Sequence, residues 1–491
     1  LGQETDASVA MAPAATAMVA IVATSDTTAT INTSSAEVGV NVAAERLETL
    51  PVISRNIVSA TVLAPGIQVI SGSQVDPTKK GSSYMTQGDG QGRGTNFNID
   101  GGDNNSTDVG GYVSSLPMDA VGEFQVVTNQ YKAEFGRSNA GFLNVVSKAG
   151  SNSFTGVVTG QYTDQSLRAM TADEGTKKDT KDQSIGATVS GPILKDKLFY
   201  MASVEKRQQE SPSATFSPEA IAAYPGTASV KTKVLSTVAY ARIDWSATPW
   251  LNVTGTYSYD KNETPNQSFG TPEFFNGNSN LASLGTGLNK TERGGLKFVT
   301  NIGSNVVWES NFVYFDYTNN IRPMDDPDSL NGYYAVRTRT SKKYPIPSDK
   351  TAWAGFDANS YQNTGIRRFQ WRNDVSVFYG DHALKGGLDY QRYTMADSLT
   401  FYPVTGPNLF SVIGVPFGPG LYGASLAGDT NVVRAAIMPQ GLTPGNTIKQ
   451  YGFYAQDDWT INPKWSLYVG LRADKDTSLD FMQCAAIKDI Y

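Results

Sequence analysis

The sequence predicts an all-β membrane protein, in which an antiparallel transmembrane β-barrel follows a small α+β domain. Two observations predict this fold class. Many segments alternate between apolar and polar side chains with a period of two, which is typical of strands with two unlike faces. The connections between these segments are alternately short and long, as in an outer-membrane barrel with tight turns at one rim and long loops at the other.

The composition is compatible with a membrane barrel. The 491 residues exceed the length of one ordinary domain. No run of the sequence approaches the ~18 to 20 apolar residues of a membrane-spanning helix. A barrel strand needs only ~10 residues and hides half of them from lipid, so average hydropathy does not reveal it. The formal net charge of −6 and the lack of a basic stripe argue against nucleic acid as a partner.

Few residues of this chain are suited to catalysis or to metal binding. Cys484 is the only cysteine and His382 the only histidine, so an intrachain disulfide framework and a Cys/His zinc cluster are excluded. His382 lies in the turn "YGDHALKG", where a solvated turn residue is a better interpretation than a catalytic base. The sequence therefore predicts neither an enzyme nor a bound cofactor or metal.

Changes in composition divide the chain into four parts. Residues 1–34 are rich in Ala, Thr and Ser and are expected to form a flexible leader. Residues 35–150 mix a helical piece, "AAERLETLP", with short strands and polar loops, and predict the small α+β domain. Residues 151–474 carry the alternating segments and predict the barrel. Residues 475–491 do not continue the alternation.

The predicted barrel contains eleven alternating segments joined by two kinds of connection. Short connections such as "GDH" and "NPK" are rich in turn formers. Compact soluble domains seldom contain five long connections without regular structure, so their presence favours the barrel. The strands are expected near 153–164, 184–191, 196–207, 235–246, 250–260, 293–302, 305–318, 367–379, 383–394, 449–460 and 464–474, and the long connections near 165–183, 208–234, 261–292, 319–366 and 395–448.

Alternation within single strands predicts which side chains face lipid. A half-buried soluble sheet whose apolar face packs on a core would show the same alternation, and only the loop pattern favours the membrane. The segment "NVVWESNFVYFDY" carries aromatic residues on both faces, and its orientation is not assigned. We expect Ala241, Ile243, Trp245, Leu251, Val253, Tyr257, Tyr259, Trp465, Leu467, Val469 and Leu471 to face lipid, and Arg242, Asp244, Asn252, Thr254, Thr256, Ser258, Arg472 and Asp474 to face a wet interior.

Several long motifs resemble one family. "RGTNFNIDGGDNNSTD" followed by "LPMDAVGEFQVVTNQYKAEFGRSNAGFLNVVSKAGSNSFTG" resembles the plug domain of TonB-dependent outer-membrane receptors, and most of all the Oar-like group. "QYGFYAQDDWTINPKWSLYVGLRAD" resembles a later hairpin of the same receptors. The resemblance implies a plug inside the lumen of a barrel of about 22 strands. It also implies a bacterial outer-membrane receptor that imports a bulky extracellular ligand, surrounded by outer-membrane lipid and energised by a TonB-type protein in the periplasm.

The resemblance also suggests site residues. A short β-prone segment in the leader is the candidate for the "TonB box", which would add a strand to the energising partner. Glycines at family turn positions would supply left-handed backbone or close approach. Charged plug residues would lock the plug to Arg242, Asp244, Arg472 and Asp474, a structural and gating role, because enclosed charges must be paired or hydrated. The candidates are Met18, Val19, Ala20, Ile21, Val22 and Ala23 for the box; Gly94, Gly101, Gly102, Gly136 and Gly141 for the turns; and Arg93, Asp100, Glu123, Glu134 and Arg137 for the charges.

Other interpretations stay open. "GDGQGRG" lacks the spacing and the preceding strand of a dinucleotide loop, so phosphate binding is disfavoured. "DGGDNNSTD" offers oxygen ligands to calcium but lacks the EF-hand spacing. A surface adhesion or structural envelope protein that uses the barrel as an anchor is the alternative function. Because eleven strands are half of a 22-strand barrel, we expect the chain to be a fragment, or a truncated or frame-shifted copy, of a longer receptor.

Overall fold

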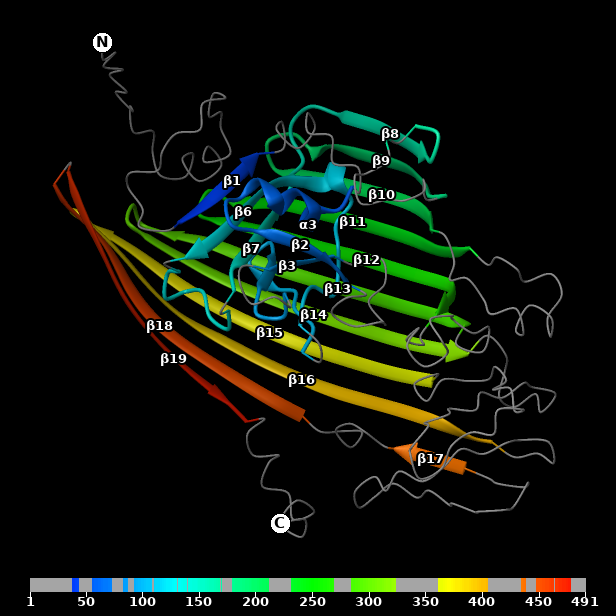
Figure 1. The fold of residues 1–491 in the computed structure, drawn as a ribbon. Helices are drawn as coiled ribbons and strands as arrows, with labels where there is room; N and C mark the ends of the chain where they lie inside the picture. The colour runs from blue at the N-terminus through cyan, green and yellow to red at the C-terminus, as the bar shows by residue number, and fades with distance from the viewer. Residues whose placement is uncertain are drawn as a thin grey trace, which may run out of the picture.

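The computed structural model describes two packed parts: a small mixed domain, called the plug below, and a large curved antiparallel sheet, called the barrel wall (Figure 1). The plug lies against one face of the wall. Among the described residues, no helix is long and apolar enough to cross a membrane. The described residues are 38–43, 55–72, 83–86, 92–107, 110–129, 131–138, 140–167, 169, 179–211, 231–268, 284–323, 361–404, 434–438, 447–462 and 464–477.

The plug is built on a five-stranded sheet in the order β1-β6-β7-β4-β5, in which only the β4–β7 pair is parallel. A second, two-stranded sheet pairs β2 with β3. The helical piece expected at "AAERLETLP" lies almost entirely outside the described residues. The elements are β1 (Val38–Ala43), α3 (Ile57–Ala60), η1 (Thr61–Leu63), β2 (Gln68–Ser71), β3 (Ser83–Thr86), β4 (Asn96–Ile99), β5 (Gly102–Asp103), η3 (Met118–Ala120), β6 (Val121–Asn129) and β7 (Phe142–Ser147).

The plug has its own apolar core, and two barrel residues complete it. Asn56 caps α3 by accepting a hydrogen bond from the Val58 N–H at 2.9 Å, which fixes the start of the helix whose apolar residues enter this core. Met201 and Tyr240 of the barrel wall belong to the same cluster, so plug and wall share buried surface. The plug residues of the core include Val42, Ile57, Val58, Met85, Phe97, Ile99, Val121, Phe124, Val126, Leu143 and Val145.

The barrel wall runs in sequence order, with eleven strands along one antiparallel path from β8 to β19. All eleven predicted segments are strands of this path, which confirms the predicted fold class. A further short strand, β17 (Arg434–Met438), pairs with the end of β16. The other strands are β8 (Thr155–Asp164), β9 (Lys181–Leu194), β10 (Leu198–Ser211), β11 (Thr232–Thr248), β12 (Leu251–Ser268), β13 (Leu284–Ile302), β14 (Val306–Pro323), β15 (Tyr361–Tyr379), β16 (His382–Val404), β18 (Thr447–Asn462) and β19 (Trp465–Asp476).

Most strands are longer than the alternation predicts. β12 continues to Ser268 and β16 to Val404, so the connections at that rim are shorter than expected. The added piece of β12, "KNETPNQS", contains no apolar side chain apart from Pro265, so period-two alternation cannot reveal it. The strands therefore continue to pair beyond the part of the sequence in which apolar and polar residues alternate. β8 and β19 do not pair with each other, so the described strands form an open wall.

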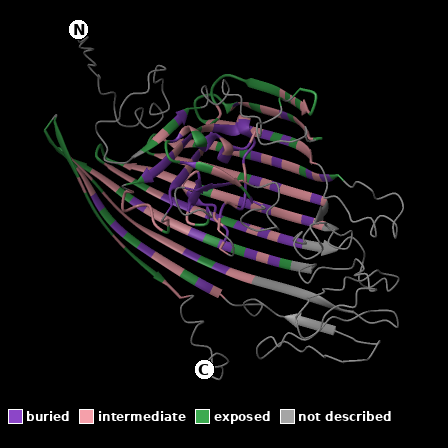
Figure 2. Ribbon diagram, viewed as in Figure 1, coloured by how far each residue is buried: buried purple, intermediate pink, exposed green. Residues whose placement is uncertain are grey.

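Strand β11 has two unlike faces. Ile243 is 49% exposed and Trp245 is 50% exposed, whereas the alternate residue Arg242 contacts the plug. Figure 2 shows the buried residues gathered in the plug and in the strands behind it. β14 now has an orientation: Phe315 and Tyr317 are buried towards the plug, while Tyr314 is 49% exposed on the outer face. Aromatic residues occur on both faces of β14 because the plug buries its inner face.

A charge placed on the outer face should destabilise the wall, because hydrocarbon cannot solvate it. We expect Ile243→Arg to lower the free energy of unfolding by about 2 kcal/mol or more, although Arg242 is accommodated next to it on the inner face. Urea-induced unfolding in detergent, followed by tryptophan fluorescence, measures the change. Ile243→Leu is the control and should stay within about 1 kcal/mol of the parent. Equal stability of the Arg and Leu variants would contradict a lipid-facing Ile243.

Candidate functional site at the plug–barrel interface

A row of buried side chains crosses the inner face of the wall. Direct register pairs follow one another from β10 to β16, so the row is continuous across seven neighbouring strands. It combines hydroxyl, aromatic and guanidinium groups, a mixture that hydrocarbon would not tolerate and that needs partners from the plug. This inner belt consists of Ser203, Tyr240, Ser258, Arg293, Phe315, Arg368 and Tyr393, each at most 6% exposed.

The plug segment 99–103 binds the middle of the belt. The Asp100 carboxylate accepts a hydrogen bond of 2.6 Å from the Tyr240 hydroxyl, and further ones from Ser147. The carbonyl of Ile99 accepts one of 2.8 Å from Arg293 Nη2. Because buried guanidinium and phenol groups are costly without partners, these bonds fix where the segment lies.

Asp103 is the main acid of this segment. Its carboxylate forms an ion pair of 2.7 Å with Arg368, whose guanidinium also lies 4.3 Å from the centroid of the Phe315 ring. Arg137, from another plug segment, contacts the same carboxylate. Gln370 accepts a hydrogen bond of 2.8 Å from the Asp103 N–H. One plug carboxylate therefore connects two plug segments with strand β15.

Two glycines allow the segment to approach the wall. Gly101 has a left-handed backbone, with φ of 78°. A Cβ atom on Gly102 would lie 2.5 Å from Arg293 Nη2 and 2.5 Å from Val313 Cγ2, so no side chain fits there. The backbone itself makes the contact with the belt, which explains why the sequence has two successive glycines at this turn.

A second plug segment, residues 131–137, contacts the later strands. Glu134 forms ion pairs with Arg372 of β15, at 3.2 Å, and with Lys385 of β16. Gln456 of β18 accepts a hydrogen bond of 3.0 Å from the Glu134 N–H, and Arg472 of β19 donates one of 3.3 Å to its carbonyl. Four strands of the wall thus bind a single plug residue.

The electrostatics of Glu134 favour its ionised form. Burial by itself would raise the pKa of this carboxyl, but Lys385 and Arg372 outweigh the burial and hold the pKa below its ordinary value of 4.5. The carboxylate is therefore charged and paired in the docked plug. Breaking such a buried pair from one side is costly, because the remaining cations lose their partner.

The third contact lies near the first strands of the wall. Arg55 forms ion pairs of 2.9 Å with Asp119 of the plug and with Glu205 of β10. Thr159 of β8 donates a hydrogen bond of 2.8 Å to the Asp119 carboxylate. This group joins the plug to the opposite side of the wall from Glu134 and its partners.

Three plug residues at these contacts have an unusual backbone. Arg55, Asp100 and Arg137 are non-glycine residues with left-handed φ angles of 42°, 52° and 58°. Each also reaches the wall: Arg55 contacts Glu205, Asp100 contacts Tyr240, and Arg137 contacts Gln450. Left-handed backbone in residues with a Cβ atom is strained, and it persists where surrounding contacts enforce it.

The predicted site residues fall into two groups. Asp100, Gly101, Gly102, Glu134, Gly136 and Arg137 all lie at the interface, and Arg242 donates a hydrogen bond of 3.0 Å to the Ser147 carbonyl of the plug. Asp244 and Asp474 bind the arginines of their own strands, Arg242 and Arg472, at 2.8 and 2.7 Å. Arg93 and Glu123 are exposed, Gly94 accepts a backbone hydrogen bond from Ala140, and Gly141 has φ of 116°. Met18 to Ala23 lie outside the described residues.

Sequence reasoning missed most of the cations that bind the plug. Arg368 and Arg372 occupy inward positions of β15, at the same period-two spacing that identified Arg242 and Asp244 on β11. The same period-two alternation, applied to β15 and β16, predicts that Arg368, Arg372 and Lys385 face inward. The sequence presents Asp103 only as one of the oxygen ligands that "DGGDNNSTD" could offer to calcium. Its carboxylate and that of Asp100 instead bind Arg and Tyr side chains, and within the described ranges no group of three or more acidic, His or Cys residues could hold a metal.

Comparisons with known proteins agree with this architecture. A family model described as "Outer membrane beta barrel domain" matches residues 146–234 and 224–480. A curated relative, the TonB-dependent transporter Oar of Myxococcus xanthus, is 32% identical over 189 residues, which cover 35% of this chain and 17% of the relative.

Solved structures with the same fold are larger. The outer membrane transporter YddB of Escherichia coli has a TM-score of 0.62 at 15% identity, and the siderophore receptor PirA of Acinetobacter baumannii has 0.57 at 16%. In both comparisons the match covers 90% of this chain and 57% of the other chain. The chain thus spans little more than half the length of the structures it resembles.

Adding a methyl group at Gly102 should disturb the docked plug, because the new Cβ atom has no space beside Arg293 and Val313. We expect Gly102→Ala to lower the free energy of unfolding by about 1 to 3 kcal/mol. Gly255→Ala is the matched control, since no atom lies within 4 Å of a Cβ at that position. Equal urea midpoints for both variants would show that segment 99–103 does not pack against the wall as described.

Stability should depend on pH through Glu134. The pKa of the Glu134 carboxyl is lower in the folded protein than its unfolded value of 4.5. The contribution of this carboxylate to the free energy of unfolding is therefore fully present above pH 4.5 and is lost as the pH falls through the folded pKa. We expect Glu134→Gln to cost about 3 kcal/mol at pH 7 and to reduce the pH dependence below pH 4.5. Urea titrations at several pH values measure both effects. The exposed Glu123→Gln is the control, and an E134Q variant that matches it would contradict the proposed ion pairs.

Proposed function

Because this chain belongs to the outer membrane beta barrel domain family, and so to proteins of the bacterial outer membrane, we propose that it acts in a TonB-dependent transporter. The plug bound across the inner face of the wall is the observation that carries this proposal. A passive porin is disfavoured, because the plug covers the inner face that a pore would need to keep open. The relatives named above are transporters and receptors, and none is named as an enzyme.

The polar character of the interface supports a plug that moves. Ion pairs and hydrogen bonds hold Asp100 and Asp103 to the inner belt and Glu134 to the later strands, beside the apolar clusters that plug and wall share. Water entering the interface can replace such bonds one at a time, whereas a large apolar interface would resist separation. The charged residues that fix the closed position are therefore the residues we propose to control opening.

The proposal that the chain acts in a transporter also includes an energising partner, a kind of ligand and a closed barrel. The energising partner is a TonB-type protein in the periplasm, and residues 18–23 are the candidate segment that binds it. The ligand is bulky, in line with the siderophore and ferric enterobactin receptors among the structural neighbours. The described wall forms part of a larger closed barrel, because open edges at β8 and β19 would leave backbone groups unpaired in lipid, each at a cost of several kcal/mol.

Tying the plug to the wall tests the proposal. The Ser114 and Ser258 hydroxyl oxygens lie 3.4 Å apart across the interface, so Ser114→Cys with Ser258→Cys should form a disulfide. The pair is made together with Cys484→Ser. Cells expressing the protein are screened for uptake of labelled siderophores, peptides and oligosaccharides. We expect uptake that needs the proton gradient, stops on oxidation of the cysteine pair and returns on reduction.

A second cysteine pair provides the control. Thr188 and Ser203 lie on neighbouring strands of the wall with their hydroxyl oxygens 2.7 Å apart, so cross-linking them leaves the plug free. Uptake should survive oxidation of this pair. Equal uptake by both oxidised variants would contradict plug movement. Surface binding that is independent of the proton gradient, with no uptake, would favour the anchored adhesion protein instead.

A further inference from the structure

A second row of polar side chains lies on the inner face of the wall, closer than the inner belt to the strand ends from which the longer connections leave. Direct register pairs connect its members across six neighbouring strands, from β8 to β13. Each member is half-buried, whereas the register continues to Asn319 and Thr364, which are buried, so the open part ends at β13. This polar row consists of Gln161, Ser184, Arg207, Ser236, Asn262 and Asn289.

The polar row lies beside the place where plug segment 113–115 contacts the wall. The Ser115 N–H donates a hydrogen bond of 2.7 Å to Asp260, and the Thr291 hydroxyl donates one to the same segment. Asp260 lies two residues before Asn262 and therefore faces the same side of β12. A ligand that enters from the rim with the longer connections meets the polar row at the edge of the plug.

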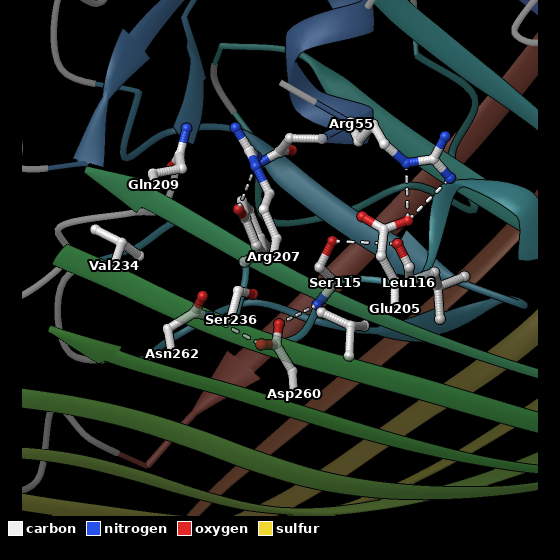
Figure 3. Close-up of a pocket in the computed structure, with 13 residues that line it drawn as sticks. Arg55, Ser115, Leu116, Glu205, Arg207, Gln209, Val234, Ser236, Asp260 and Asn262 are labelled. Carbon is white, nitrogen blue, oxygen red and sulfur yellow. Dashed lines mark hydrogen bonds and ion pairs between the residues drawn. The ribbon is translucent and has the colours of Figure 1, made fainter. Parts of the chain in front are cut away.

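A cavity between the plug and strands β10, β11 and β12 is lined by Ser236 and Asn262, which are directly paired across β11 and β12 (Figure 3). Its volume is about 40 Å³, which is room for one small functional group. The Asn262 amide nitrogen donates a hydrogen bond of 2.8 Å to Asp260, so its oxygen is left to accept. The Ser236 hydroxyl can donate and accept, and a ligand hydroxyl, which has the same two abilities, fits between the two side chains.

The charges that line the cavity balance. Two guanidiniums, of Arg55 and Arg207, face two carboxylates, of Glu205 and Asp260. Arg55 forms an ion pair of 2.9 Å with Glu205, and Arg207 donates a hydrogen bond of 3.0 Å to Asp182 of β9. The other five members of the polar row are neutral amides and hydroxyls. A charged ligand gains little from such a surface, whereas an uncharged ligand with many hydrogen-bonding groups fits it.

The spacing of the polar row distinguishes between uncharged ligands. Neighbouring strands lie ~4.8 Å apart, so six directly paired residues extend over roughly 24 Å. One sugar unit of an extended oligosaccharide has nearly the length of one such step and carries hydroxyl groups at every unit. An extended peptide presents side chains to one side only at every second residue, a step of roughly 6.6 Å, and does not match the row.

We propose that the polar row binds an uncharged oligosaccharide, with one ligand hydroxyl in the cavity between Ser236 and Asn262. The proposal rests on the transporter function proposed above and names the class of ligand. Asn262 also connects this ligand to the plug, because it donates to Asp260, which accepts from the Ser115 N–H. Binding of the oligosaccharide therefore acts on a hydrogen bond that holds plug segment 113–115 against the wall.

Binding of oligosaccharides to the purified full chain tests the proposal. The chain is kept in a zwitterionic detergent, since a sugar headgroup would compete, and is probed with an array of uncharged, anionic and cationic oligosaccharides of increasing length. We expect uncharged members to bind, with an affinity that rises with length until the ligand covers the row. The member that binds most tightly is then titrated into the variants by calorimetry.

Two substitutions in the row should weaken binding. Ser236→Ala removes one hydroxyl, and we expect about threefold weaker binding. Asn262→Leu removes the amide that contacts both the ligand and Asp260, and we expect about tenfold weaker binding. Ser236→Ala leaves the Asp260 contacts intact, so it covers the case in which Asn262→Leu fails to fold.

Two matched controls should bind as the parent does. Thr237→Val removes a hydroxyl from the next residue of β11, which faces outward, and Asn252→Leu makes the same exchange as Asn262→Leu at the opposite end of β12. No binding by any member of the array, binding of charged members only, or equal binding by all four variants overturns the proposal. Energised uptake of a siderophore without oligosaccharide binding would reject the ligand class and keep the transporter, whereas oligosaccharide binding without uptake would do the reverse.

Discussion

The structure depends on the supply of hydrogen-bond partners to the inner face of the barrel wall. Strands that cross a bilayer can turn only one face to hydrocarbon, and the other face here carries Arg293, Arg368 and Tyr240 at full burial. The hydrogen bonds of these three side chains go to plug atoms: Tyr240 to Asp100, Arg293 to the Ile99 carbonyl and Arg368 to Asp103. The plug provides carbonyls and carboxylates at their positions, from a glycine turn at the contact with an apolar core behind it.

Contacts between plug and wall are distributed over the whole sheet. Arg55 binds β10, the segment 99–103 binds the strands from β11 to β15, and Glu134 binds the strands from β15 to β19. The three contacts come from different parts of the plug, just before α3, at the β4–β5 turn and between β6 and β7, so three separated points fix the orientation of the plug.

Alternation was sufficient to predict the strands and their faces wherever the two faces meet unlike surroundings, as at Ile243 and Arg242. It failed for β14, because Phe315 and Tyr314 are equally aromatic although one packs on the plug and the other lies on the outer face. It also missed strand ends whose residues are all polar, such as "KNETPNQS". The ion pair of Glu134 with Lys385 joins residues 251 positions apart, and no local pattern specifies which charges meet across such a distance. A match to a family position does not predict contact with the wall either: Glu123 and Glu134 both match such positions, but Glu123 is exposed.

The left-handed backbone at Asp100 differs in origin from that at Arg55 and Arg137. Asp100 and Gly101 lie between the paired residues Ile99 and Gly102, so their left-handed φ angles belong to a tight hairpin turn that Asp-Gly favours. Arg55 and Arg137 have no such preference, and the conformation costs roughly 1 to 2 kcal/mol for each of them. Both contact the wall, so the interface stabilises a backbone that these two residues would otherwise disfavour.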